Sequence, residues 1–144
     1  MSKKDIREKA ISQTREELES SVEKDQLLVK AVKQLDQLEK DIRDEVERLR
    51  DWYAVHFPEL EQEITEDDRF VDILGKYGIE RSEIEPFGDM AAKSTGSELS
   101  EKDRALIEKS VSTIASMKEL RDEIHDYVEE GAREEFQNLS VLLG

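Results

Sequence analysis

The apolar residues of this chain recur at helical spacing in two long stretches. In the first, residues 27–57, an aliphatic residue returns every seventh position, and a second row contains Leu38. Val32, Val46 and Tyr53 widen the stripe beyond a strict two-stranded seam. The members at seven-residue spacing are Leu28, Leu35, Ile42 and Leu49. This pattern predicts a long helix that ends before Pro58, because the residue preceding a proline is disfavoured in the helical region.

The second stretch follows Ser100, which is placed to cap a helix. Its stripe comprises Ile107, Val111, Ile114, Met117, Leu120, Ile124 and Val128. Gly131 is expected to weaken this helix without ending it, and Asn138 or Ser140 is expected to begin a new one. Between the two stretches, capping patterns at Thr65 and Ser82 predict two short helices. Residues 5–22 are helical in propensity but carry few apolar side chains.

Neither stripe can bury its apolar face alone, so the two long helices are expected to pack against each other. The prediction is an all-α fold: a long antiparallel coiled-coil pair with short helices packed at its ends or tip. If the apolar stripe is wider than one partner helix can cover, a second copy of the chain is expected on the open face. This favours a dimeric helical bundle. The residues expected to carry packing or dimer contacts are Leu28, Leu35, Leu38, Ile42, Leu49, Ile107, Val111, Ile114, Met117 and Ile124.

Composition fits this picture, since 41% of the 144 residues are charged and 36% are hydrophobic. The net charge of −15 disfavours extensive contact with nucleic acid, because phosphate binding depends on cations, and these are scattered among carboxylates along the sequence. Direct RNA contact is therefore expected to be small or confined to a limited area. The chain has no cysteine and no apolar run of membrane-spanning length, which predicts an intracellular protein without a membrane partner.

The sequence offers little for catalysis or cofactor binding. His56 and His125 stand alone, without the paired spacing of metal ligands, so we expect a packed and a solvated histidine, respectively. Residues 88–95 depart from a phosphate-binding loop because Ala92 occupies the position of the glycine before the lysine. The carboxylates at 59–68 lack the spacing of a calcium loop. We predict no metal, no cofactor and no enzymatic activity.

The densest group of aromatic rings lies where the first stripe ends. It comprises Trp52, Tyr53, His56 and Phe57, followed by Pro58, Glu59 and Leu60. Such a group is either a packed corner or a binding site, and helical spacing favours a packed corner in which proline fixes the turn.

Three stretches of the chain resemble the Nop family. Residues 49–60, LRDWYAVHFPEL, resemble the family's L-R-E-W-Y…H-F-P-E-L motif in the NOSIC region. Residues 90–103 are similar to the tip between the family's coiled-coil helices, with Ser94-Thr95-Gly96 where Ser-Met-Gly is more frequent. Residues 138–144 are similar to the opening of the RNA-facing Nop domain, preceded by Phe136-Gln137 in place of Ala-Pro.

The resemblance implies a scaffold segment of the box C/D ribonucleoprotein, which directs RNA 2′-O-methylation. It implies self-dimerisation through the coiled coil and, in the full-length protein, association with fibrillarin, a kink-turn-binding protein and guide RNA. The expected organisation is a linker helix over 1–26, a NOSIC and coiled-coil domain over 27–137, and the start of a truncated Nop domain over 138–144. The chain is thus expected to be a piece of a longer protein.

The absence of low-complexity tails favours an archaeal, cytoplasmic protein; a eukaryotic one would be nuclear or nucleolar. Two alternatives to the methylation scaffold remain at this stage. One is a spliceosomal relative that shares the Nop region and binds a small nuclear ribonucleoprotein. The other is a generic acidic coiled-coil tether.

Overall fold

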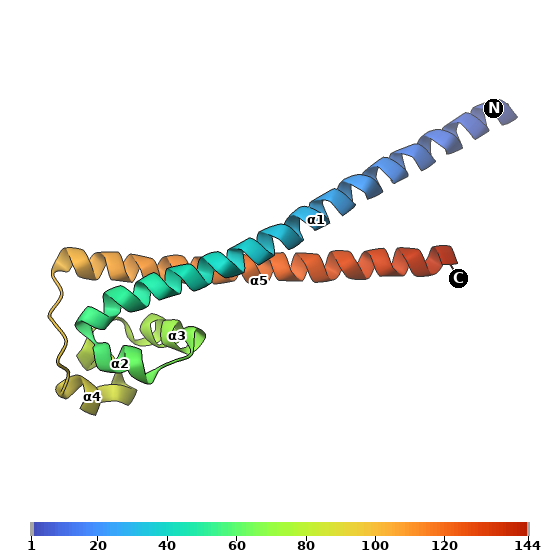
Figure 1. The fold of residues 1–144 in the computed structure, drawn as a ribbon. Helices are drawn as coiled ribbons and strands as arrows, with labels where there is room; N and C mark the ends of the chain where they lie inside the picture. The colour runs from blue at the N-terminus through green and yellow to red at the C-terminus, as the bar shows by residue number, and fades with distance from the viewer. Residues whose placement is uncertain (1, 144) are drawn as a thin grey trace. The chain divides into compact units, whose positions relative to one another are not determined.

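The computed structural model describes residues 2–143. At residues 18, 20, 21 and 138–143 it describes the backbone alone. All its regular elements are helical, which confirms the all-α prediction for the described residues (Figure 1). The elements in chain order are α1 (Lys3–His56), α2 (Pro58–Glu63), α3 (Asp67–Tyr77), the 3-10 turns η1 (Arg81–Glu83) and η2 (Glu85–Phe87), α4 (Gly88–Ala92) and α5 (Glu101–Leu143).

Helix α1 joins two segments that the sequence pattern treats separately, residues 5–22 and 27–57. The polar stretch between them does not interrupt the helix because glutamate, lysine and glutamine are good helix formers. The helix ends at His56 as predicted. Phe57, the residue before Pro58, leaves the helical region at φ −140° and ψ 69°.

Helix α5 begins after Ser100, whose hydroxyl accepts a hydrogen bond from the backbone N–H of Asp103 at 3.2 Å. The predicted cap is therefore confirmed. The helix continues through Gly131, also as predicted, and runs to Leu143. The expectation of a new helix at Asn138 or Ser140 is wrong, since a residue that favours a cap is tolerated inside a helix when its neighbours are helix formers.

The short elements differ more from the prediction. Helix α3 starts at Asp67, two residues after Thr65, and no side chain caps it. It ends at Tyr77 and is followed by Gly78, whose φ of +84° is a backbone conformation that favours glycine. The helix expected from Ser82 is replaced by two 3-10 turns and α4, because Pro86 lacks a backbone N–H and displaces the residue before it from the helical region.

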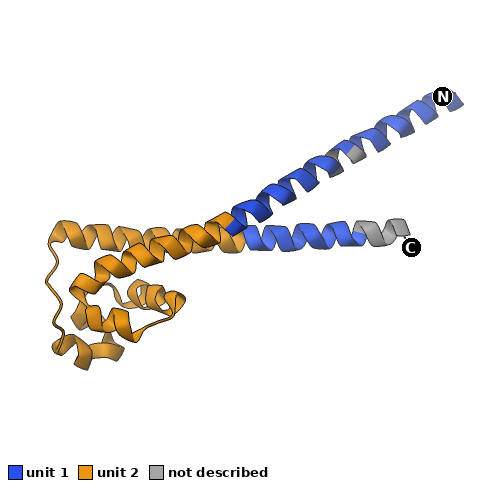
Figure 2. Cartoon of the chain, in the orientation of Figure 1, with its two compact units in different colours: residues 1–36, 124–144 blue, residues 37–123 orange. Residues whose placement is uncertain are grey.

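The chain divides into two compact units (Figure 2). Unit 2 comprises residues 37–123, and unit 1 comprises residues 1–36 together with 124–144. In unit 2, α1 and α5 flank a shared groove, with Asp41 and Glu45 on one side and Lys109 and Thr113 on the other. Lys118 of α5 also forms an ion pair with Asp68 of α3, at 2.9 Å.

The core lies in unit 2. It contains six of the predicted stripe residues, each at most 9% exposed: Leu38, Ile42, Leu49, Ile107, Val111 and Ile114. Met117 is half-buried there. In unit 1, Leu28, Leu35 and Ile124 are half-buried. A Cβ atom built on Gly131 would lie 2.7 Å from Cδ1 of Leu28, so α5 and α1 approach closely at that point.

No helix of the described part of the chain is both long enough and apolar enough to cross a bilayer.

Replacing Ile42 with alanine is expected to lower the free energy of unfolding by about 2–4 kcal/mol, because a buried aliphatic side chain leaves a cavity. Ile42 is 5% exposed. A urea titration measures the change, and Leu106→Ala is the control, since Leu106 is 55% exposed and its truncation is expected to alter stability by about 0.5 kcal/mol or less. Equal effects of the two substitutions would contradict burial of the stripe.

Candidate functional site

An aromatic corner closes unit 2 where α1 ends. Tyr53 of α1, Phe57 between α1 and α2, and Phe70 of α3 have no exposed surface. The Tyr53 and Phe70 rings meet edge to face, with centroids 5.7 Å apart and planes at 72°, a favourable arrangement for aromatic quadrupoles. The Tyr53 hydroxyl donates a hydrogen bond to the Ile79 carbonyl at 2.9 Å. Burial, with a smaller contribution from Glu80, raises the pKa of Tyr53, which stays neutral in this environment.

Trp52 lies outside this corner, although the sequence pattern grouped it with the buried rings. Its side chain is 52% exposed. Successive residues of a helix point about 100° apart, so Trp52 and Tyr53 cannot both face the same core. Pro58 and Glu59 are half-buried, and His56 and Leu60 are fully buried.

Glu59 holds a segment that is distant in sequence, the tip loop of residues 93–100. Its carboxylate accepts hydrogen bonds from the Thr95 N–H at 2.7 Å, the Ser94 hydroxyl at 2.7 Å and the Thr95 hydroxyl at 3.0 Å. The Thr95 N–H makes the largest contribution and Ser94 the next in lowering the pKa of Glu59 from 4.5 to about 2. The ionised carboxylate therefore holds the loop through three hydrogen bonds that it accepts.

His56, three residues before Glu59, holds the same loop. Its Nδ1 lies 2.9 Å from the Ser97 carbonyl oxygen, and the Ser97 N–H donates to the Val55 carbonyl at 2.8 Å. Because a carbonyl oxygen only accepts, Nδ1 carries the proton in this contact. His56 is completely buried, so it serves as a packed and hydrogen-bonded histidine at the end of α1.

Gly96 brings the backbone of the tip loop directly against α1. A Cβ atom on Gly96 would lie 1.8 Å from the His56 carbonyl oxygen and 2.9 Å from Cδ of Pro58. These distances leave no room for a side chain, so glycine is required here by close approach of the backbone.

Arg81 also attaches the tip loop to α1. No pattern in the sequence predicted this role. From η1, its Nη1 donates to the His56 carbonyl at 3.2 Å and to the Gly96 carbonyl at 3.0 Å, and its Nη2 pairs with Glu98. One guanidinium thus bridges the end of α1 and two positions of the tip loop. Such a contact needs the planar fork of arginine, which presents several donors at fixed angles.

The hydrogen bonds that Glu59 accepts predict how the stability of the fold depends on pH. A carboxyl group whose pKa is lower in the folded state contributes stability above its unfolded pKa, and that contribution is lost as the pH falls through the folded value. For Glu59 the interval runs from about 4.5 down to about 2. Glu59→Gln is therefore expected to be less stable than the wild type at neutral pH and to lose less stability between pH 4.5 and pH 2. Thermal unfolding monitored by circular dichroism across this range would show two parallel profiles if Glu59 made no such contribution.

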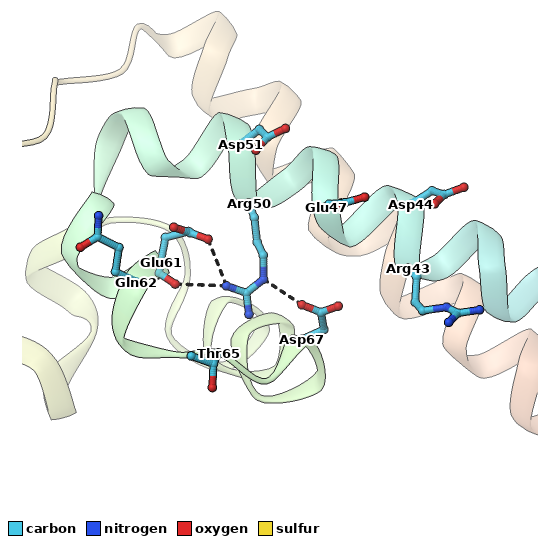
Figure 3. Close-up of a pocket in the computed structure, with 9 residues that line it drawn as sticks. All are labelled: Arg43, Asp44, Glu47, Arg50, Asp51, Glu61, Gln62, Thr65 and Asp67. Atoms are coloured by element: carbon cyan, nitrogen blue, oxygen red, sulfur yellow. Dashed lines mark hydrogen bonds and ion pairs between the residues drawn. The ribbon is translucent and has the colours of Figure 1, made fainter.

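A second polar feature of unit 2 is a cleft of about 710 Å³ beside Arg50 (Figure 3). Nε of Arg50 donates to Asp67 at 2.9 Å, and Nη1 donates to the Glu61 carbonyl at 3.1 Å and the Glu61 carboxylate at 3.3 Å. The guanidinium also lies 4.4 Å from the centroid of the Phe70 ring. Arg50 therefore ties α1 to α2 and α3, and its contacts are those of a structural ion-pair group.

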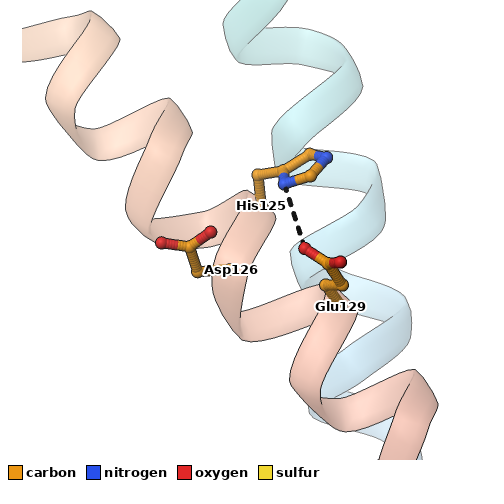
Figure 4. A group of neighbouring side chains, drawn as sticks. All are labelled: His125, Asp126 and Glu129. Atoms are coloured by element: carbon orange, nitrogen blue, oxygen red, sulfur yellow. Dashed lines mark ion pairs between the residues drawn. The ribbon is translucent and has the colours of Figure 1, made fainter.

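The residues around His125 form a third polar cluster, in unit 1 (Figure 4). The potential ligand atoms of His125, Asp126 and Glu129 lie within 4.8 Å of one another, and Nδ1 of His125 is 3.9 Å from the Glu129 carboxylate. All three side chains are exposed, as predicted for His125. Exposed acidic groups of this kind are common on a charged helix, and this one gives no sign of a built site.

Comparison with known proteins identifies the family. A family model described as "Nop: snoRNA binding domain, fibrillarin" matches residues 34–144. The chain belongs to the Nop family. Two of the three stretches that resemble the Nop family, residues 49–60 and 90–103, meet in the structure, because Glu59 and His56 of the first bind Thr95 and Ser97 of the second. The corner and the tip loop therefore form one three-dimensional feature.

Individual relatives are similar over most of the chain. Human nucleolar protein 58 is 29% identical over 149 residues, which cover 94% of this chain and 28% of that protein. An uncharacterised NOP5 family protein of Methanocaldococcus jannaschii is 27% identical over 135 residues, covering 85% of this chain and 33% of the relative. Bovine nucleolar protein 56 is 26% identical, with 83% and 23% covered. The chain thus spans a third or less of these relatives.

Proposed function

We propose that this chain is a scaffold segment of a box C/D ribonucleoprotein that directs RNA 2′-O-methylation. The Nop family match over residues 34–144 carries the proposal. The geometry supports it, since the tip loop is fastened to the end of α1 by Glu59, His56 and Arg81, all of which serve to hold helices in place. A segment built in this way positions other modules and performs no chemistry of its own.

The proposed mechanism is spacing. Two copies associate through the stripes of α1 and α5, and the dimer sets the distance between two fibrillarin modules on a guide RNA. Apolar side chains that remain exposed on α1 between residues 22 and 32 support a second copy as the partner: Val22, Leu27, Val29 and Val32. The stripe residues at the edge of the pattern, Leu28 and Leu35, are only half-buried within one chain.

In the whole protein, the proposed partners are fibrillarin, a kink-turn-binding protein and box C/D guide RNA. The proposed domain boundaries keep residues 1–26 as a linker helix, 27–137 as the NOSIC and coiled-coil domain, and 138–144 as the start of a Nop domain. The proposed location is the cytoplasm of an archaeal cell, or the nucleolus if the protein is eukaryotic, as the names of the nucleolar relatives indicate.

The RNA recovered with the protein tests this function. The chain is tagged in its own cells, purified after crosslinking, and the associated RNA is sequenced, with an untagged culture as the control. Enrichment of box C/D guide RNAs together with fibrillarin is the expected result. Enrichment of spliceosomal RNA would favour the spliceosomal alternative, and recovery of no specific RNA would leave only a coiled-coil tether.

A further inference from the structure

The start of α1, residues 3–15, carries a cationic face that the sequence alone did not reveal. Residues 3–15 contain five of the cations and only two of the carboxylates of the chain, a local charge of +3 in a protein of net charge −15, and Glu16, Glu17 and Glu19 follow directly. Helical spacing places four of the cations on one side, around Ile11. We define this cationic face as Lys3, Lys4, Arg7 and Arg15.

The face is open to solvent along its whole length. Every side chain from 3 to 15 is exposed. None of the four cations forms an ion pair with another side chain that the structure describes. Glu8 borders the face beside Lys4, and Glu19 lies one turn beyond Arg15, whereas Asp5 lies on the far side of the helix. From Lys3 to Arg15 the face extends about 18 Å at ~1.5 Å per residue.

We propose that this cationic face binds the phosphate backbone of RNA, without reading its sequence. Four cations on one exposed helical face match a polyanion in both sign and extent. Each phosphate that they neutralise releases condensed counterions, which favours binding even when the contacts remain wet. The inference rests on the proposed ribonucleoprotein role, and it assigns to unit 1 a contact that keeps the guide RNA close to the scaffold.

The other acidic surface available to the face is α5 of a second copy. Between residues 119 and 135, α5 carries eight carboxylates and two arginines. Ion pairs between exposed side chains contribute only about 0–1 kcal/mol each and are screened by salt, and the face offers only Ile11 at its centre for apolar burial. A polyanion adds the entropy of counterion release, so RNA is the occupant that the charge pattern favours.

The test is a fluorescence-anisotropy titration of the 144-residue chain with a labelled oligouridylate of about 20 nucleotides. With about four phosphates neutralised, the affinity of the wild type is expected to fall about 50-fold between roughly 50 and 200 mM salt. In the triple variant Lys4→Ala, Arg7→Ala, Arg15→Ala, one contact remains, so the same salt change is expected to lower affinity only about threefold. Binding at low salt is expected to weaken at least about tenfold.

A matched variant removes the same charge elsewhere on α1: Lys30→Ala, Lys33→Ala, Lys40→Ala. These lysines are exposed, and the control is expected to keep the wild-type affinity and salt dependence. Alanine favours helix, so circular dichroism should show all three proteins equally helical. If RNA affinity fell equally in both variants, the net charge of the protein would explain the effect, and the inference would be overturned.

Light scattering separates the remaining outcomes. A loss of RNA binding in the first variant with an unchanged solution mass supports the inference. A changed mass with unaltered RNA affinity would assign the face to a second copy and overturn it. The proposed function fails independently, if the tagged protein recovers no box C/D RNA while the oligouridylate result stands.

Discussion

Replacing Gly96 with alanine is expected to detach the tip loop from α1 and to lower the free energy of unfolding by about 3 kcal/mol. The new Cβ would lie 1.8 Å from the His56 carbonyl oxygen, and that oxygen belongs to the backbone of a helix end, which cannot move as a flexible side chain does. Overpacking of a tight site costs ~1–3 kcal/mol, and displacement of the loop also breaks its hydrogen bonds to Glu59 and Arg81. Urea titration of both proteins measures the difference.

Gly75→Ala is the matched control for this substitution. Gly75 lies within α3, and a Cβ there meets no atom within 4 Å. Alanine in a helix is favoured over glycine by up to ~1 kcal/mol, so this variant is expected to be as stable as the wild type or more stable. If Gly96→Ala were as stable as Gly75→Ala, the tip loop would not be held against α1 as described.

Truncation of Phe57 to alanine is expected to have the largest effect, lowering the free energy of unfolding by about 3–5 kcal/mol. Phe57 has no exposed surface and packs beside Tyr53, with ring centroids 6.4 Å apart. Its removal leaves a cavity at the corner where α1 ends and α2 begins. The loss is expected to appear as a lower midpoint in a denaturant titration with an unchanged slope.

Phe136→Ala makes the same chemical change at an exposed position. Phe136 is 76% exposed on α5, so its truncation is expected to alter stability by about 0.5 kcal/mol or less. Comparable losses at the two positions would mean that Phe57 is not part of a closed core.

The sequence predicts this fold well where the signal is periodic. The seven-residue spacing identified Ile42 and Leu49, and the second stripe identified Ile107 and Ile114; all four are buried. The prediction that Trp52 is buried was wrong. A wide apolar stripe does not indicate which of two adjacent aromatic residues, Trp52 or Tyr53, faces the core. The lengths of α1 and α5 were also missed, since a polar stretch inside α1 and capping residues inside α5 resemble helix boundaries.

The attachment of the tip loop could not be predicted from residue patterns alone. Glu59 and Thr95 are 36 positions apart, and Arg81 reaches Gly96 from a 3-10 turn. Hydrogen bonds between distant segments leave no period in the sequence. The resemblance to family motifs singled out residues 49–60 and 90–103 but did not predict that they meet. The cationic face was missed for a different reason. Cations counted along the chain are scattered, and they gather only when residues 3–15 are wound into a helix.

We propose that this segment associates with a second copy and thereby spaces the modules of the particle. Light scattering across a range of protein concentrations tests it most directly, because it measures the solution mass of this chain alone. We expect a mass approaching twice 16.7 kDa as concentration rises. A mass that stays at 16.7 kDa at every concentration would contradict the claim, and the stripes would then be satisfied within one chain.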